Sequence, residues 1–214
     1  MEETHTTDSR STATPATSVA LNERAEQNLQ FIRELMESSS SFTGVSGTGY
    51  MLAGASALLA TWIAMQQATA SSWLLVWMAE LLVAGTLAIG FTIRKTHQQG
   101  ESLWSTTGKK VLFAFLPPMS VGAVLTVFMY RLNAVETLPG IWLCIYGTAV
   151  MTAGAYSVSV LPLMGGLFLG LGTVLLLLNP IGPEMLGVGN FWLGAGMGGL
   201  HLIFGYTIWK NYGG

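Results

Sequence analysis

The feature that most limits the fold of this chain is a set of six long apolar stretches that are almost free of charge. They lie at residues 49–66, 71–93, 111–130, 140–158, 160–179 and 186–208. A helix needs about 20 residues to cross the hydrocarbon core of a bilayer, and each stretch has roughly that length. Only 9% of the chain is charged, far below the proportion in soluble domains. The sequence therefore predicts an all-α, polytopic bundle of six transmembrane helices within residues 48–209.

The Lys and Arg residues outside the stretches predict the orientation of the bundle. Six crossings place both termini on one side, and eight of the nine basic residues then share that side, with Arg131 alone on the other. Cytoplasmic connections carry the excess of positive charge. We therefore expect the N-terminus and the C-terminal residues 210–214 in the cytoplasm. Trp73 and Trp142 then fall near outer ends of spans, as in an interfacial aromatic belt.

The first 47 residues divide into two parts. Residues 1–20 are rich in Ser and Thr and have no apolar period, which predicts a disordered polar tail. Residues 21–47 predict an amphipathic cytoplasmic helix and a linker, with Leu21, Leu29, Ile32 and Met36 on its apolar face. The helix is net acidic, so it is not expected to bind anionic lipid headgroups. Docking on its own bundle and docking on a cytoplasmic or membrane protein partner remain the alternatives; direct nucleic-acid binding is not expected.

Small residues spaced four apart predict where the spans pack. Gly166 with Gly170 and Gly194 with Gly198 have this spacing, which allows two helix backbones to approach closely. Such faces serve packing within one bundle or the association of two copies as a homodimer. Pro117 and Pro118 lie inside the third stretch, where two missing N–H donors predict a kink or a break.

Glu80 and His201 are the candidate ligand or proton-relay residues, because a polar group inside a span needs a reason. Counting from the span ends places them about five residues apart in depth, or roughly 8 Å, so a direct pair would need helix tilt, whereas a water or a hydroxyl such as that of Thr86 could bridge them. The alternative for Glu80 is a neutral carboxylic acid that donates to a backbone carbonyl. The other histidines, His5 and His97, lie outside the spans, so bis-histidine haem ligation and a three-ligand metal site are not expected, and no cofactor is predicted.

Gly54-Ala55-Ser56-Ala57 has the form Gly-x-Ser-x, and Ser56 and His201 are predicted at similar depth. A nucleophile and a base within hydrogen-bond reach would suit an intramembrane serine hydrolase. This is the third functional alternative. We expect no catalytic residues and hold enzymatic activity to be the less favoured class.

Several strings resemble an uncharacterised bacterial family of six-span integral membrane proteins. They are Phe31-Ile32-Arg33, Met36-Glu37, Ser41-Phe42-Thr43, Trp77-Met78-Ala79-Glu80, Phe115-Leu116-Pro117-Pro118, Tyr130-Arg131, Leu138-Pro139-Gly140-Ile141-Trp142-Leu143, Tyr146-Gly147, Gly199-Leu200-His201 and Tyr212-Gly213-Gly214. The resemblance covers nearly everything after Leu21. It implies a multi-pass protein of the bacterial cytoplasmic membrane with a short cytoplasmic N-terminal helix, and it implies no known activity.

These observations favour a non-catalytic protein of the lipid bilayer. Its predicted role is to sense or bind something in the membrane, or to serve as an accessory subunit that acts through the N-terminal helix. The second alternative is a small-molecule or proton-coupled transporter that uses Glu80.

Overall fold

The computed structural model describes residues 23–32, 35–36, 41–100, 102–178, 182 and 184–213. The chain divides into two units, residues 1–40 and 41–214. In the first unit, residues 23–32 and 35–36 are helical, and Leu29, Ile32 and Met36 are exposed. Leu21 and the predicted tail at residues 1–20 lie outside the described residues.

The named secondary-structure elements of the second unit are all helical in its described part. Its elements are α2 (Gly47–Ala64), α3 (Ala70–Gln98), α4 (Thr106–Arg131), the 3-10 turn η1 (Val135–Thr137), α5 (Leu138–Gly154), α6 (Val160–Leu178), α7 (Met185–Leu193), the π-helical segment η2 (Gly194–Leu200) and α8 (His201–Tyr212). Because α7, η2 and α8 follow one another without a break, we call them the α7–α8 rod. Each of the six predicted stretches corresponds to α2, α3, α4, α5, α6 or the rod, with small shifts at the ends.

Five segments are long and apolar enough to cross a membrane: residues 70–98, 106–131, 135–154, 160–178 and 185–212. The chain is thus a multi-pass membrane protein. The α2 helix has 18 residues but is not among the five, since Gly, Thr, Tyr and Ser dilute its apolar content.

Short polar side chains determine where three of the helices begin. The hydroxyl groups of Ser46, Thr69 and Ser105 accept hydrogen bonds from the backbone N–H of Gly49, Ser72 and Gly108, at 3.2, 3.1 and 3.1 Å. Each bond satisfies an N–H that has no partner within the helix. The Ser105 cap explains why α4 begins five residues before the predicted stretch at 111–130.

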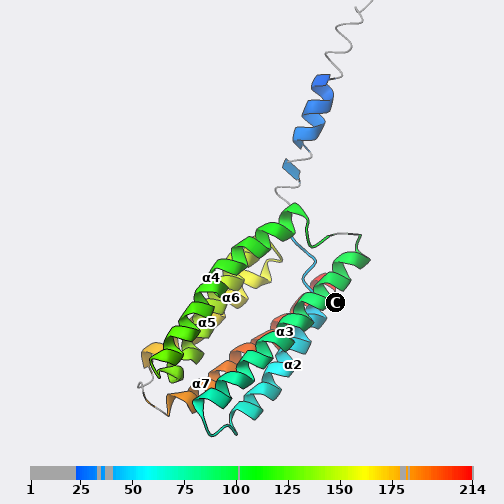
Figure 1. Ribbon diagram of the computed structural model, residues 1–214. Helices are drawn as coiled ribbons and strands as arrows, with labels where there is room; N and C mark the ends of the chain where they lie inside the picture. The colour runs from blue at the N-terminus through cyan, green and yellow to red at the C-terminus, as the bar shows by residue number, and fades with distance from the viewer. Residues whose placement is uncertain are drawn as a thin grey trace, which may run out of the picture. The chain divides into compact units, whose positions relative to one another are not determined.

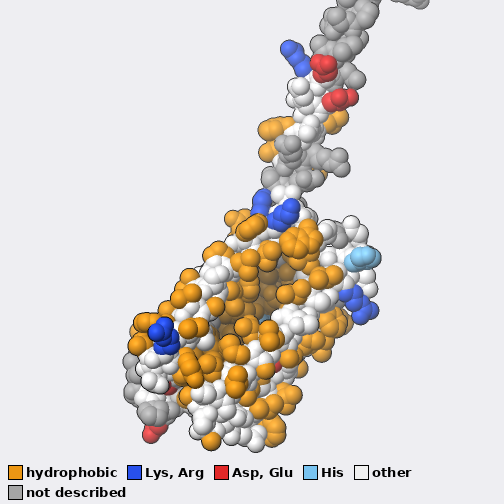
Figure 2. Space-filling model, in the orientation of Figure 1, with side chains coloured by type: hydrophobic (Ala, Val, Ile, Leu, Met, Phe, Trp, Pro, Cys, Tyr) orange, Lys and Arg blue, Asp and Glu red, His pale blue; other side chains and the backbone are white. Residues whose placement is uncertain are grey.

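The helices form two halves (Figure 1). The first half contains α2, α3 and the α7–α8 rod, and the second half contains α4, α5 and α6. We call the end of the bundle where α2 begins the base, and the opposite end the tip. α3 and α4 do not pack extensively on each other, and Figure 2 shows a hollow, lined by hydrophobic side chains, between them.

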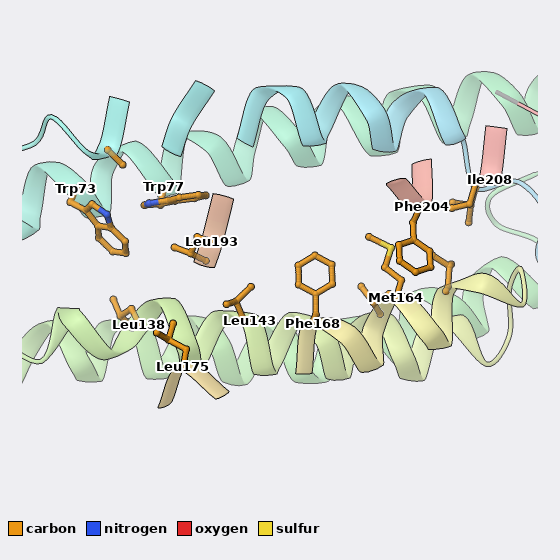
Figure 3. Close-up of a cluster of buried hydrophobic side chains, with 14 of the residues drawn as sticks. Trp73, Trp77, Leu138, Leu143, Met164, Phe168, Leu175, Leu193, Phe204 and Ile208 are labelled. Carbon is orange, nitrogen blue, oxygen red and sulfur yellow. The ribbon is translucent and has the colours of Figure 1, made fainter. Parts of the chain in front are cut away.

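Large apolar side chains fill the space between the two halves (Figure 3). Trp73, Trp77, Leu193, Phe204 and Ile208 come from the first half. Leu138, Leu143, Met164, Phe168 and Leu175 come from the second half, and all ten are buried. The hydrophobic core of the bundle therefore lies between the two halves.

Glycines set the closest contacts between helices. A Cβ at Gly165 would lie 2.5 Å from the Met151 backbone N, and one at Gly172 would lie 2.7 Å from the Cys144 backbone N, so α5 and α6 touch backbone to backbone. The predicted pair Gly166 and Gly170 lies beside this contact. A Cβ at Gly166 would meet one atom at 3.9 Å, and one at Gly170 would meet nothing within 4 Å. The close contact of α6 with α5 therefore uses Gly165 and Gly172. The spacing of four residues predicts Gly166 and Gly170 instead.

The predicted pair Gly194 and Gly198 lies against α2. A Cβ at Gly194 would be 2.9 Å from Thr61 Cγ2, and one at Gly198 would be 2.4 Å from Leu58 Cδ2. This packing is within one chain.

The α4 helix continues through Pro117 and Pro118, so the predicted break is absent. Pro118 has no N–H to bond the carbonyl of Ala114 four residues earlier. Thr152 Oγ1 of α5 lies 3.0 Å from that carbonyl, and also 2.9 and 3.1 Å from the carbonyls of Thr148 and Ala149 in its own helix. Its one hydrogen is shared among these acceptors, so the neighbouring helix offers the Ala114 carbonyl a partial substitute for the hydrogen bond that the proline removes.

Candidate functional site

Glu80 is part of a buried stripe on α3. It follows Trp73 and Trp77 at positions i+7 and i+3, which places the three side chains on one helix face. Glu80 is 9% exposed, Trp73 2% and Trp77 4%. Figure 3 shows both tryptophans pointing into the space between the halves. Glu80 therefore faces the interior of the bundle and not the lipid.

Ser56 of α2 is the hydrogen-bond partner of Glu80. Its hydroxyl donates to Glu80 Oε1 at 2.8 Å and also lies 2.9 Å from the carbonyl oxygen of Ala53. A hydroxyl has one hydrogen. If Glu80 is a neutral carboxylic acid, it can donate to Ser56 Oγ while Ser56 donates to Ala53, so both contacts are hydrogen bonds at once. The geometry suits the neutral form that a low-dielectric environment favours.

His201 is held by a different partner. Its Nε2 lies 2.7 Å from the hydroxyl oxygen of Tyr146 on α5, and this bond joins the two halves near the middle of the bundle. The imidazole is 7% exposed. Its Nδ1 is buried and has no hydrogen-bond partner of good geometry among the described residues, although the backbone of Gly196 and Met197 lies close to it.

The π-helical segment η2 precedes His201 directly. Its sequence, Gly194-Ala195-Gly196-Met197-Gly198-Gly199-Leu200, has four glycines, and side chains of α2, α5 and α6 pack against three of them. A π-helical turn is wider than an α-turn and changes the face on which the following residues lie. His201 is therefore positioned by the glycines before it.

Four aromatic rings from four helices accompany His201. Tyr50 of α2, Tyr146 of α5 and Phe168 of α6 have ring centroids 5.5, 5.4 and 5.4 Å from the imidazole. Phe115 of α4 lies edge-on to Tyr146 at 6.2 Å. We call these five residues the His201 cluster. It crosses the bundle from α4 to α2, and Tyr50, Phe115 and Tyr146 are only half-buried.

The predicted site residues do not pair as the sequence suggested. Glu80 bonds to Ser56 and His201 bonds to Tyr146, and no hydrogen bond joins Glu80 to His201 in the described part of the chain. The Ser56–His201 dyad is also not formed there, because each side chain has its other partner. Sequence reasoning missed the hydrogen-bonding role of Tyr146, since tyrosines inside an apolar stretch were not treated as polar.

A second polar network at the tip was also missed. Asn190 of α7 is 1% exposed. Its Oδ1 accepts from Nε1 of both Trp73 and Trp77, each at 3.1 Å, and its Nδ2 donates to the Thr61 carbonyl at 2.9 Å. An amide inside an apolar stretch is itself a signal of interhelical hydrogen bonding, and residues 186–208 contain only this one.

The tip network extends to the second half through Trp142. This indole stacks on Trp73, with centroids 5.6 Å apart and planes at 9°, and donates from Nε1 to Thr126 Oγ1 at 2.8 Å. Trp73 is buried and Trp142 half-buried, and both lie near helix ends at the tip, where their rings pack within the bundle; their place in an interfacial belt stays a prediction.

Among the described residues, no three His, Cys, Asp or Glu side chains gather where they could hold a metal ion. No protein-family model matches this chain, and no curated protein or solved structure shows significant similarity to it.

Proposed function

We propose that this protein binds a small molecule within the bilayer as a non-catalytic binding or sensing protein, at a site formed by Glu80, Ser56 and the His201 cluster. The observation that supports this most is the placement of buried polar groups beside a hollow. Two hydrogen-bonded pairs, Ser56–Glu80 and Tyr146–His201, lie at mid-depth in the bundle, and Glu80 is on α3, one of the two helices that border the hollow.

The stripe of α3 that contains Glu80 supports an accessible site. Towards the base, the stripe continues with Ala84, Leu87 and Phe91, which face inward yet are only partly buried. The hollow of Figure 2 lies alongside this stretch of α3. A ligand there would meet apolar walls with Glu80 at one margin, the usual composition of a small-molecule site.

The charges favour a neutral or cationic ligand. In the described bundle, every Lys and Arg lies near a helix end, so no cation is available at mid-depth to bind a phosphate or carboxylate. A carboxyl, a hydroxyl and an imidazole can accept or donate hydrogen bonds. The ligand class is thus an apolar molecule with one hydrogen-bonding group.

Six crossings with both ends in the cytoplasm of a bacterium belong to this proposal. An α-helix of 18 residues is about 27 Å long, close to the hydrocarbon thickness, so α2 fits as the sixth span. The distribution of Lys and Arg favours the base as the cytoplasmic end. In this arrangement the N-terminal helix reports the occupied state to a protein partner.

The test is to purify the protein in native membrane nanodiscs and identify small molecules that remain bound. Glu80→Gln keeps the shape of the side chain and removes the acid. We expect it to weaken retention of the bound molecule by about tenfold, the effect of one lost hydrogen bond of ordinary strength to a charged or acidic group. Glu136→Gln, in η1 outside the helices of the site, is the matched control and should retain the molecule fully.

Equal retention by wild type, Glu80→Gln and Glu136→Gln would contradict the site, and so would a wild-type protein that carries only bulk lipid. Replacing Tyr50 by Phe extends the test to the His201 cluster without loss of the ring.

A proton-coupled transporter is the second candidate, and the burial of Glu80 between the two halves is the observation that favours it. Proteoliposomes with an internal pH dye should then show a flux that Glu80→Gln abolishes and Glu136→Gln preserves. A flux absent from wild type, together with specific retention of a ligand, would decide for binding without transport.

A further inference from the structure

The segment between the N-terminal unit and α2 is packed into the bundle. Residues 41–46, which the sequence placed in a linker, are non-helical, and we call them the strap. Phe42, Val45 and Ser46 are 5%, 6% and 0% exposed. A Cβ at Gly44 would lie 2.3 Å from Thr96 Cγ2 of α3. The strap is therefore a fixed structural element and not a surface connection.

The strap is hydrogen-bonded to the second half through the turn between α5 and α6. The backbone N–H of Phe42 donates to the carbonyl of Tyr156 at 2.9 Å, and Ser157 Oγ donates to the carbonyl of Phe42 at 2.7 Å. The backbones of Phe42 and Ser157 also pair as an isolated parallel β-bridge, and the Ser157 side chain adds its bond to this pairing.

The strap is also hydrogen-bonded to the first half. Lys95 of α3 is 4% exposed, and its Nζ donates to the carbonyls of Val45 and Gly213 at 2.9 and 3.1 Å. One buried ammonium thus holds α3, the strap and the C-terminal end of the chain together. A buried Lys is uncommon unless its charge is compensated, and two carbonyl dipoles compensate it here.

These bonds make the strap a bridge between the halves at the base. Elsewhere, the tip is bridged by Trp73 stacked on Trp142, and the middle by the Tyr146–His201 bond. At the base, α3 and α4 do not pack extensively on each other, and the hydroxyl groups of Ser159 and Tyr212, 3.2 Å apart, form a second polar link between the halves. The separation of α3 and α4 there therefore depends in part on what holds the strap.

We propose that the strap is a regulatory tie, which keeps the hollow narrow at the base while it is bound to both halves. Because residue 41 directly follows the N-terminal unit, a force on that unit acts first on Phe42. Release of the Phe42–Ser157 bridge leaves the strap attached to the first half alone, through Lys95 and through its continuation into α2, and the halves then separate more easily at the base while the tip stays closed. This inference rests on the proposed function only in assigning the hollow to a ligand.

The experiment measures distances between the halves with spin labels in the full chain, in a Cys144→Ser background because Cys144 is the single cysteine. One pair, Ile93→Cys with Phe113→Cys, reports the base; both side chains are exposed, at 51% and 71%. A second pair, Leu75→Cys with Val127→Cys, reports the tip; these are 69% and 61% exposed.

Ser157→Ala removes one bond of the strap. We expect the population with the longer base distance to rise about fivefold, because one hydrogen bond of ordinary strength changes a two-state ratio by that factor. The tip distance should not change. Ser157→Thr keeps a hydroxyl and should restore the wild-type distances.

Thr207→Val is the matched control. Thr207 lies near the base in α8, and its Oγ1 donates to the Ile203 carbonyl of the same helix at 2.9 Å, so removal of this hydroxyl should leave both distances unchanged. If Ser157→Ala does not fold, Lys95→Met tests the other attachment and carries the same expectation.

Unchanged base distances in Ser157→Ala and Lys95→Met would overturn the inference, and so would an equal change at base and tip. The distances do not depend on any ligand. If the strap inference is wrong, ligand retention should still be sensitive to Glu80→Gln. If the proposed function is wrong, the shift in the base distance should still be observed in Ser157→Ala.

Discussion

Replacing Gly165 by alanine should destabilise the bundle, whereas the same change at the neighbouring Gly166 should not. Gly165 lies in the backbone contact between α5 and α6. An added Cβ would be 2.5 Å from Met151 N, 2.6 Å from the Gly147 carbonyl oxygen and 2.8 Å from Met151 Cα. All three atoms belong to backbone, so no flexible side chain can move out of the way.

The magnitude follows from the displacement that the methyl group requires. Ordinary contact begins near 3.4 Å, so the helices must separate locally by about 0.9 Å from the 2.5 Å contact. Overpacking of this kind costs about 1–3 kcal/mol. Alanine also favours a helix over glycine by up to about 1 kcal/mol. Because both glycines are inside α6, this gain is common to the two variants and their difference isolates the packing cost.

The assay is equilibrium unfolding in mixed detergent and SDS micelles, followed by circular dichroism. We expect Gly165→Ala to be less stable than Gly166→Ala by about 1–3 kcal/mol. A second matched pair is Gly172→Ala, where the Cβ would meet Cys144 Sγ at 2.6 Å, against Gly170→Ala, where it would meet nothing within 4 Å. Equal stability within each pair, or a larger loss at Gly166 and Gly170, would refute the contact and favour the face chosen from the spacing of four.

Three further predictions test the polar contacts. Asn190→Leu leaves two buried indole N–H groups without an acceptor, so unfolding should require roughly 2–4 kcal/mol less free energy, with tryptophan emission altered; wild-type stability would contradict the network. Thr152→Val should cost about 0.5–1.5 kcal/mol, and Pro118→Ala in the same chain should recover it, because the new N–H can bond the Ala114 carbonyl; a loss that persists in the double variant would speak against this. Tyr146→Phe should cost about 1 kcal/mol, measured by the same unfolding, whereas Tyr206→Phe on the exposed face of α8 keeps the ring and should have no effect.

The positions of the helices could be predicted because they follow from the solvent. A bilayer excludes unpaired backbone groups and charges, so apolar length and the first polar residues mark each helix directly. The start of α4 is an example, because the capping side chain of Ser105 explains why this helix begins early. This cap could have been predicted from the sequence, since Ser is a preferred N-cap residue. The strap was assigned to a linker because a short stretch with Ser, Gly and Phe has no period that would reveal burial.

The glycine contacts could be predicted in kind but not in position. The α6 sequence has glycines at 165, 166, 170 and 172, which lie on different faces of one helix. A spacing of four selects one face, but the contact with α5 uses Gly165 and Gly172, seven residues apart, as in helices that cross at a small angle. Which face is used depends on the partner helix, where Gly140, Gly147 and Gly154 recur at the same spacing of seven. Only a comparison of the two helices could have shown this.

The partner of Glu80 could not be deduced from depth alone. Depth separated Glu80 from His201 by about one and a half turns, and the structure pairs each with a residue near its own level. Sequence distance gave no guide, because Ser56 is 24 residues from Glu80 and Tyr146 is 55 from His201. Both partners are hydroxyl groups, and a hydroxyl group inside an apolar stretch hardly changes the mean hydropathy that identifies the span.

The two pairs differ in what they connect, and this difference bears on how the bundle could change shape. Ser56 and Glu80 lie on α2 and α3 within the first half, so their bond is unaffected when the halves move apart. Tyr146 and His201 lie in different halves, and their bond must lengthen or break in any such movement. A widening of the hollow that reaches the middle of the bundle would therefore lengthen the Tyr146–His201 bond and free the imidazole, which has no second partner of good geometry among the described residues. Ser56 would meanwhile keep Glu80 in place, so such a widening acts on the imidazole and not on the carboxyl.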